Sequence, residues 1–414
     1  MNAAPPGIKG RCPGVLAPMR SGDGLIARLR PRGAALSADA LDVLAGAARQ
    51  LGNGLADLTS QGNIQLRGLD ETGAAALAHR LAPLGLLDED AAAEARRNII
   101  VSPLNGRDPA RLIDIAPLAA ALAAQLQSAH DLASLPAKFT FLIDDGGDLS
   151  LGGVRADLRF EARRAQPPLE ARRAHGGVAF AVKAGGDSAS ATTLGMCPPD
   201  RLPEVAIALA RRNTVWLPHA AASVRGGANA DDCMRACRSA DAGFVAALAP
   251  WGRLTAAMLE ALARAARASA LGEIRLTPWR VALVPIDAPA ARAALRARLA
   301  QAGFVVTSGD PRARVAACVG APACASATTD VRTDASYFAS VLAAAPAGAS
   351  LHVSGCAKGC AHSGVAAVTL VGRDGRYDLV RNANAQAAPA EPSLSRDAVK
   401  ARLADIFATE ETCV

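Results

Sequence analysis

The chain has 414 residues, a formal net charge of +7, 51% hydrophobic residues and only 3% aromatic residues. This length exceeds what one core usually needs, so we expect two or more domains. No stretch reads as a membrane span of about 20 apolar residues, and the N-terminus lacks a secretion-signal core. No basic run interleaved with aromatic residues occurs, so we expect no binding of nucleic acid. Because a membrane span and a secretion signal are both lacking, we expect a cytoplasmic protein that binds no membrane.

Two stretches of the chain repeat each other. Residues 24–69 and residues 243–286 both read as strand, helix and strand, with apolar positions at helical spacing between the strands. Ser37 and Thr255 stand just before the two helical stretches and are the expected N-caps. A match of this length predicts a duplicated unit with approximate two-fold symmetry and a cleft between the halves.

We therefore predict an α+β fold that is internally duplicated, with two ferredoxin-like half-domains and two α/β lobes. Lobe 2 is expected to bind a metal cluster through cysteines that lobe 1 lacks. The predicted divisions are half-domain 1 at 10–85, lobe 1 at 96–210, a connector at 211–240, half-domain 2 at 241–308, lobe 2 at 311–383, and a tail with a terminal helix at 384–414.

Four of the nine cysteines lie in two glycine-bearing stretches of the second half, and the matching stretch 98–166 has none. Their spacing is Cys-x5-Cys followed by Cys-x3-Cys. Four thiolates bind either a [4Fe–4S] cluster or a tetrahedral zinc ion. Structural zinc usually has two to four residues between paired ligands, so the spacing favours iron–sulfur. The predicted ligands are Cys318, Cys324, Cys356 and Cys360.

Other candidate ligands are left open. Cys233 and Cys237 form a rival pair that reads as one face of a helix, without glycines or a second pair nearby. His362 lies two residues after a predicted ligand, where it could bind a second metal, contact the cluster or substrate, or serve only the fold. The remaining cysteines are read as structural or incidental: Cys12, Cys197 and Cys413.

The duplication, the cysteine spacing and the stretch "LTSQGNIQLRG" resemble the sulfite and nitrite reductase haemoprotein superfamily over about residues 10–385. In that superfamily the cysteine at the position of Cys360 bridges the cluster to sirohaem iron. The chain departs from the reductase pattern at three places. Gln61 replaces an anion-binding arginine, Thr140 replaces the second lysine of a pair that begins at Lys138, and "CAKGC" replaces "CPNGC".

Three motifs are similar to the precorrin-3B synthase branch of this superfamily: "RCPGVLAPMRSGDGLIARLRP", "GEIRLTPWR" and "SGCAKGCAHSG". The resemblance implies an O2-dependent monooxygenase that hydroxylates precorrin-3A and forms a ring lactone in aerobic cobalamin biosynthesis. It implies a [4Fe–4S] cluster and a mononuclear non-haem iron whose ligands the sequence does not identify. The implied partners are precorrin-3A, O2 and an electron-donor protein or reductase supplied by a reduced nicotinamide.

The resemblance also selects basic residues for the carboxylates of the tetrapyrrole, because guanidinium binds carboxylate as a fork. A solvated surface charge remains the alternative for each of them. Two other functions compete: a sirohaem-dependent sulfite or nitrite reductase, and a non-catalytic iron–sulfur electron carrier. The expected carboxylate-binding residues are Arg28, Arg30, Arg67, Arg97, Lys138 and Arg280, and further site candidates are Thr59, Gln65, Lys358 and His362.

Overall fold

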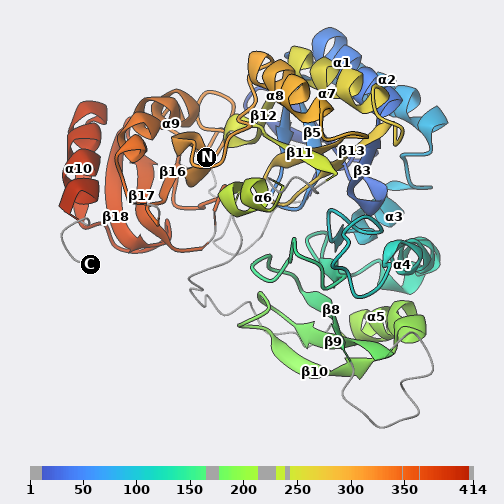
Figure 1. Cartoon of the computed structure of the whole chain (residues 1–414). Helices are drawn as coiled ribbons and strands as arrows, with labels where there is room; N and C mark the ends of the chain where they lie inside the picture. Colours follow the sequence, from blue (N-terminus) through green and yellow to red (C-terminus); the bar gives the residue numbers. More distant parts are fainter. Residues whose placement is uncertain are drawn as a thin grey trace.

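The structure is a computed structural model that describes residues 12–164, 177–212, 230–237, 243–346, 348–362 and 364–409. Strands in these ranges form four sheets, one for each half-domain and one for each lobe. In Figure 1 the two half-domains lie together at the top, lobe 1 lies beneath them, and lobe 2 lies to one side. No helix in this described part is long and apolar enough to cross a membrane.

The half-domains contain the expected strand, helix and strand. Ser37 accepts a hydrogen bond from the Ala40 N–H, and Thr255 accepts one from the Met258 N–H, which confirms both N-caps. Half-domain 1 comprises β1 (Met19–Ser21), β2 (Gly24–Leu29), β3 (Ala35–Ser37), α1 (Ala38–Leu51), β4 (Leu55–Leu58), β5 (Ile64–Leu69) and α2 (Glu71–Leu81). Half-domain 2 comprises β11 (Phe244–Leu248), β12 (Arg253–Thr255), α7 (Ala256–Arg267), β13 (Glu273–Leu276), β14 (Val281–Pro285) and α8 (Ala291–Gln301).

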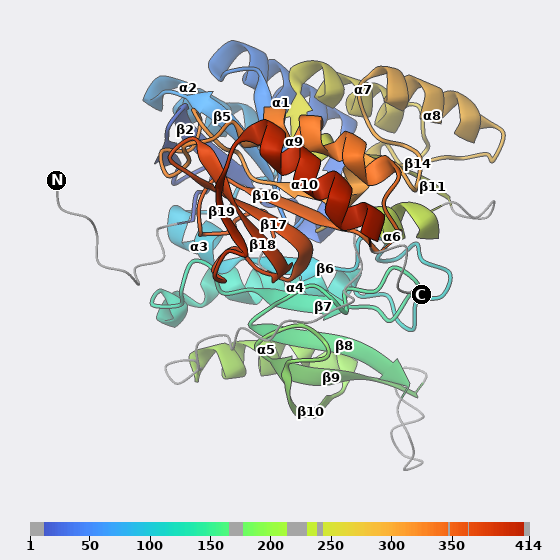
Figure 2. The ribbon, with the colours of Figure 1, turned by 90° about the vertical axis from the view of Figure 1, so that its left-hand side faces the viewer.

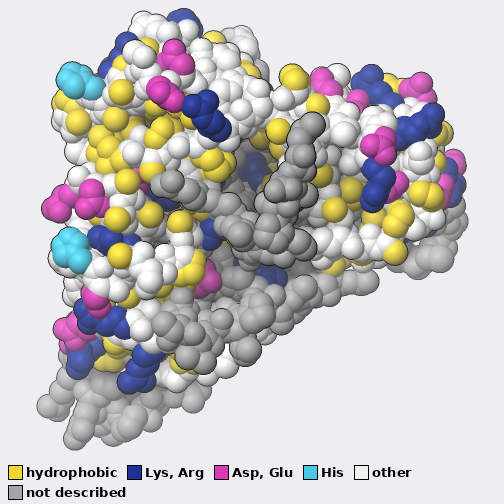
Figure 3. Space-filling model, turned by 180° about the vertical axis from the view of Figure 1, so that it is seen from behind, with side chains coloured by type: hydrophobic (Ala, Val, Ile, Leu, Met, Phe, Trp, Pro, Cys, Tyr) yellow, Lys and Arg dark blue, Asp and Glu magenta, His cyan; other side chains and the backbone are white. Residues whose placement is uncertain are grey.

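Each half-domain lends one strand to the sheet of the other. β3 pairs antiparallel with β13, and β12 pairs antiparallel with β4. Helices α1 and α7 lie side by side over this junction (Figure 1), and both contribute to one hydrophobic core. Side chains therefore fill the junction between the two half-domains. Figure 3 shows a hollow where this pair meets the lobes, with Lys and Arg side chains visible inside it.

The two lobes share one sheet topology. In each sheet three parallel strands are followed by two antiparallel ones, in the orders β6-β7-β8-β9-β10 and β15-β16-β17-β18-β19. Lobe 1 comprises α3 (Ala91–Arg96), β6 (Ile99–Val101), α4 (Ala116–Ser128), β7 (Phe141–Asp144), β8 (Leu158–Arg164), β9 (Val178–Ala184), β10 (Thr192–Cys197) and α5 (Leu202–Arg211). Lobe 2 comprises β15 (Val315–Ala317), α9 (Val331–Ala339), β16 (Leu351–Ser354), β17 (Ala366–Arg373), β18 (Arg376–Ala383), β19 (Glu391–Leu394) and α10 (Arg396–Thr409).

The segment expected to be a tail belongs to lobe 2. β19 extends the lobe 2 sheet by pairing with β18, and α10 lies against the same sheet in Figure 2. The apolar face predicted for the terminal helix is buried in the lobe 2 core, with Val399 and Leu403 at 0% exposure and Ile406 at 3%. Of the connector, the structure describes 211–212 and the stretch that contains α6 (Ala230–Ala236).

Candidate functional site

The four predicted cluster cysteines lie at one edge of the lobe 2 sheet. Cys318 directly follows β15, and the loop that carries Cys356 and Cys360 follows β16. β15 and β16 are adjacent parallel strands, so their C-terminal ends meet at the same edge. The Cys360 thiol interacts electrostatically with Cys356, Cys318 and Cys324. Strand pairing thus brings together Cys318 and Cys356, which are 38 residues apart in sequence.

Backbone N–H groups surround the Cys318 sulfur. Gly355 donates a hydrogen bond to it at 3.2 Å, and Gly320 donates a second. Both glycines are closely packed, because a Cβ on Gly355 would lie 2.6 Å from the Ala327 Cβ, and one on Gly320 would lie 2.6 Å from the Val331 nitrogen. Burial raises the pKa of the Cys318 thiol, while the two N–H donors favour the thiolate. These donors would stabilise the negative charge of a metal-bound sulfur.

Lobe 1 contains the same loop without the thiols. β6 and β7 have the register of β15 and β16, which places Ser102 where lobe 2 has Cys318. The Asp145 N–H donates to the Ser102 Oγ at 2.9 Å, as the Gly355 N–H donates to the Cys318 sulfur. The backbone geometry therefore recurs in both lobes, and the soft ligands that suit iron–sulfur occur in lobe 2 alone among these loops.

The donor set fits a cluster better than a single ion. Among the residues that the structure describes, no three Cys, His, Asp or Glu side chains converge closely enough for one metal ion. A [4Fe–4S] cluster is larger than one ion and is held by four separate thiolates, so it needs a wider arrangement. Four thiols at the end of two parallel strands, with glycine N–H donors beside them, match that requirement.

Two of the expected substrate arginines contact the cluster loops, which are the loops at residues 318–324 and 356–361. Arg67 donates to the Ala323 carbonyl in the first loop at 3.2 Å, and Arg280 donates to the Ala361 carbonyl in the second loop at 2.9 Å. Burial, followed by repulsion from Arg332, lowers the pKa of Arg280 to about 10, so the side chain stays charged at neutral pH. Both arginines connect a half-domain to lobe 2, and they position the loops that carry the cysteines.

A buried carboxylate gathers three arginines beside these loops. Asp57 on β4 is 3% exposed and accepts hydrogen bonds at 2.8 Å from Arg253 and from Arg332. Arg67 lies 3.5 Å from the same carboxylate. The three cations come from half-domain 1, half-domain 2 and lobe 2. Sequence reasoning missed Asp57, Arg253 and Arg332, because no motif or spacing marks them.

Arg28 and Arg30 form a second basic group on β2 and just after it. Arg28 donates to Gln65 at 2.8 and 2.6 Å and hydrogen-bonds Cys12. Arg30 is 4% exposed and lies 3.9 Å from Glu94. Its Nε and Nη1 have no hydrogen-bond partner among the described residues. Arg30 is therefore the expected carboxylate-binding residue whose donors are least satisfied within the protein.

The other candidates differ in their surroundings. Arg97 is buried and donates two close hydrogen bonds to Asp88, at 2.7 and 2.9 Å, so its charge is already paired. Lys138 is exposed. Thr59 closes the turn between β4 and β5 by accepting hydrogen bonds from the backbone of residues 61 and 63. Lys358 is exposed and donates to the Ser326 hydroxyl at 3.0 Å.

The comparisons with known proteins agree with this geometry. The family described as the nitrite/sulfite reductase ferredoxin-like half domain matches residues 17–84 and 238–302, which are the two half-domains. A precorrin-3B synthase from Sinorhizobium sp is 30% identical over 343 residues, covering 77% of this chain and 71% of the relative. The chain belongs to the precorrin-3B synthase family.

Two further similarities connect this precorrin-3B synthase family member with reductases. A ferredoxin–nitrite reductase from Synechococcus elongatus is 34% identical over 140 residues, which are 33% of this chain and 27% of that protein. The solved structure of the Mycobacterium tuberculosis NirA protein has a TM-score of 0.68 at 17% identity, covering 92% of this chain and 79% of that one. The predicted duplicated α+β fold is thereby confirmed.

Two positions that depart from the reductase pattern are neighbours in this family member. The Gln61 amide donates to the Thr140 hydroxyl at 3.3 Å. Thr140 also accepts from the Asn98 amide at 3.2 Å and donates to the Lys138 carbonyl at 3.0 Å. A neutral hydrogen-bonded group thus occupies the place where the reductase pattern has two cations.

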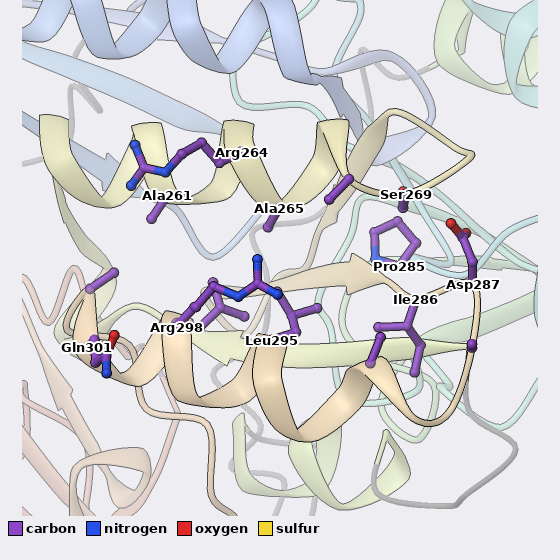
Figure 4. A pocket seen from close by; sticks show the side chains of 15 residues that line it. Ala261, Arg264, Ala265, Ser269, Pro285, Ile286, Asp287, Leu295, Arg298 and Gln301 are labelled. Carbon is purple, nitrogen blue, oxygen red and sulfur yellow. The ribbon is translucent and has the colours of Figure 1, made fainter.

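The rival cysteine pair lies away from the cluster loops. Cys233 and Cys237 are buried at 0% and 5% exposure, hydrogen-bond each other, and pack in a core with Leu149 and Phe244. A cavity of about 530 Å³ is also distant from the predicted site residues, because α7 and α8 line it (Figure 4). Cys12 hydrogen-bonds Arg28, Cys197 is buried in the lobe 1 core, and Cys413 lies outside the described residues.

Proposed function

We propose that the protein is a precorrin-3B synthase, a monooxygenase that uses O2 to hydroxylate precorrin-3A with formation of a ring lactone in aerobic cobalamin biosynthesis. The observation that carries this proposal is the 30% identity to the Sinorhizobium enzyme over 77% of the chain. The Gln61–Thr140 contact supports it, because reduction of sulfite or nitrite needs fixed cations near the bound anion.

In this proposal Cys318, Cys324, Cys356 and Cys360 hold a [4Fe–4S] cluster, which when bound supplies electrons one at a time. The N–H groups of Gly355 and Gly320 stabilise the charge on the Cys318 sulfur. Monooxygenation places one atom of O2 in the product and releases the other as water, which consumes two electrons and two protons. An electron-donor protein or reductase, supplied by a reduced nicotinamide, provides those electrons.

The chain's own part is to bind and orient a polycarboxylate beside the cluster loops. We assign this to the basic group of Arg28 and Arg30, with Lys138 at the exposed side. Arg30 has two unsatisfied buried donor nitrogens, and a carboxylate is the group that a guanidinium fork binds best. Arg67, Arg97 and Arg280 contribute by fixing the surrounding backbone, as their existing hydrogen bonds indicate.

A sirohaem-dependent reductase is the second candidate, favoured by the 34% identity to a ferredoxin–nitrite reductase over 140 residues. A non-catalytic electron carrier is a weaker alternative, because a carrier has no need for the unsatisfied arginine of a ligand site. The deciding experiment is turnover of precorrin-3A by the purified protein with a reductant under O2, with nitrite and sulfite as competing substrates. Conversion of precorrin-3A only with O2 supports the proposal, and reduction of either anion at comparable rates overturns it.

A further inference from the structure

His352 is a buried polar residue whose ring has no hydrogen-bond partner. It lies on β16, is 0% exposed, and neither ring nitrogen bonds to any described residue. A buried polar group without a partner lowers the stability of the fold. The burial, followed by His362 and Arg280, lowers the pKa of the ring to about 3, so it is neutral at physiological pH. A neutral imidazole offers one N–H donor and one acceptor.

The duplication supplies an internal comparison for this position. His352 is the second residue of β16 and pairs with Ala316, and Leu142 is the second residue of β7 and pairs with Ile100. Leu142 is also 0% exposed, and it packs in an apolar cluster with Ile100 and Trp279. The fold at this position therefore accepts an apolar side chain, and the histidine occurs in the lobe that carries the cluster cysteines.

The surroundings of His352 are polar and lie at the cluster loop. Its ring contacts the exposed His362 ring edge to face, with centroids 5.8 Å apart, and Gly359 lies over its Cε1 atom. Arg280 is beside both rings. The backbone of Arg280 has φ of 62°, a left-handed conformation that is unfavourable for a residue with a side chain.

Gly252 leaves the space that the Arg280 side chain occupies. A Cβ on Gly252 would lie 2.6 Å from the Arg280 Cδ atom, so a larger residue there would displace the arginine. Strained backbone persists when the surrounding structure enforces it, and it concentrates at functional sites. Arg280 uses one nitrogen to bind the Ala361 carbonyl. The Arg280 side chain is therefore held in a fixed position next to the unpaired His352 ring.

We propose that His352 is a substrate-binding residue, whose ring N–H donates a hydrogen bond to a carboxylate of the bound tetrapyrrole beside the Arg280 side chain. The ligand reaches the ring past His362, the exposed side chain that contacts it. This inference rests on the proposed function, because it takes the bound polycarboxylate to be precorrin-3A. In this proposal the histidine lowers the stability of the fold and increases the affinity for the ligand, a combination that is common at functional sites.

The test replaces His352 with the residue that lobe 1 has at the matched position. We expect His352→Leu to melt at or above the temperature of the parent protein and to keep its iron and sulfide content. Its affinity for precorrin-3A, measured without O2, should fall about 10- to 100-fold, the loss of one hydrogen bond to a charged carboxylate. His352→Gln keeps a donor and an acceptor and should retain most of the affinity. The reciprocal control, Leu142→His, should lower the melting temperature without changing affinity.

Each outcome decides the matter. A lower melting temperature for His352→Leu gives the ring a structural role and overturns the inference, and so does an unchanged affinity. Unchanged affinity with slower O2-dependent turnover likewise overturns the assignment to a carboxylate. If the parent protein neither binds nor converts precorrin-3A, the proposed function itself fails; if the parent does both and His352→Leu behaves identically, only this inference fails.

Discussion

Asp57 on β4 accepts a hydrogen bond from Arg332 on α9 at 2.8 Å, across 275 residues of sequence. This contact joins half-domain 1 to lobe 2 at the base of the cluster loops. The same carboxylate also pairs with Arg253 of half-domain 2 at 2.8 Å. One buried carboxylate therefore connects half-domain 1, half-domain 2 and lobe 2 through ion pairs.

Asp57→Asn should destabilise the protein by about 3–5 kcal/mol, because it leaves buried guanidinium groups without their counter-charge. Denaturant unfolding measures the loss. The matched control is Asp42→Asn, which breaks an exposed ion pair with Arg267 and should cost less than about 1 kcal/mol. Equal stability of the two variants would show that the Asp57 group does not hold the parts together.

The same carboxylate predicts a dependence of stability on pH. Burial alone would raise the pKa of Asp57, but Arg332, Arg253 and Arg67 hold it below the ordinary value of 3.8. Because the folded pKa is the lower one, Asp57 contributes its full stability above about pH 4 and loses it as the pH falls through the folded value. The parent protein should therefore lose more stability between pH 5 and pH 3 than Asp57→Asn does, and parallel acid curves would contradict this.

Serine in place of any one of Cys318, Cys324, Cys356 and Cys360 should reduce the iron and sulfide content of the purified protein. A serine hydroxyl remains protonated where a thiolate would bind iron, so the cluster loses a soft ligand. Iron analysis and the visible absorption shoulder measure the loss. Cys233→Ser is the control, because its thiol packs in a separate core and should not change iron content. A full cluster in all four variants would remove them as ligands.

The purified protein should carry no stoichiometric sirohaem and should reduce nitrite and sulfite negligibly. Gln61 and Thr140 hydrogen-bond each other, so neither offers a positive charge to a small anion. The absorption spectrum separates the outcomes, since sirohaem adds strong visible bands that a cluster lacks. One sirohaem per chain, with reduction of either anion at enzymatic rates, would favour the reductase.

Alanine at Arg30 and at Arg97 should have different consequences. Arg30 has unsatisfied donors, so Arg30→Ala should lower the affinity for precorrin-3A roughly 10- to 100-fold, the loss of a charge-assisted pair of about 1.5–3 kcal/mol. Arg97→Ala instead leaves the buried Asp88 carboxylate without its closest partner and should mainly lower stability. Arg201→Ala, which removes one side of an exposed ion pair with Glu204, controls for a general change in charge and should leave affinity and stability unchanged. Affinity, melting temperature and iron content are measured for each.

Arg280→Ala should lower cluster retention as well as substrate affinity. The side chain holds the Ala361 carbonyl in the loop between Cys360 and His362, so removing it loosens the loop that carries a predicted ligand. Iron content after dialysis measures retention. The control is Arg296→Ala, a change at an arginine of α8 that contacts Thr307 and lies outside the cluster loops. Identical iron content in the two variants would contradict this role of Arg280 in cluster retention and leave only a role in substrate binding.

The sequence by itself determined the helices and strands of the repeated unit and the presence of four thiols in two glycine-bearing stretches. Helix periodicity and the caps at Ser37 and Thr255 depend on neighbouring residues, so the strand–helix–strand units could be read locally. The Cys-x5-Cys and Cys-x3-Cys spacing could be read for the same reason. The exchange of β3 and β12 between half-domains could not be read locally, because strand pairing is a long-range choice among similar apolar stretches.

Only the tertiary structure decided which basic residues are free to bind a ligand. Arg30 and Arg97 look alike in the sequence, yet Arg97 is paired with Asp88 and Arg30 keeps unsatisfied nitrogens. The physical reason is that neighbours in space, not in sequence, decide whether a guanidinium is already paired within the protein or can still bind a ligand. The unpaired ring of His352 became visible for the same reason, since the sequence does not show what surrounds a histidine on a fully buried strand.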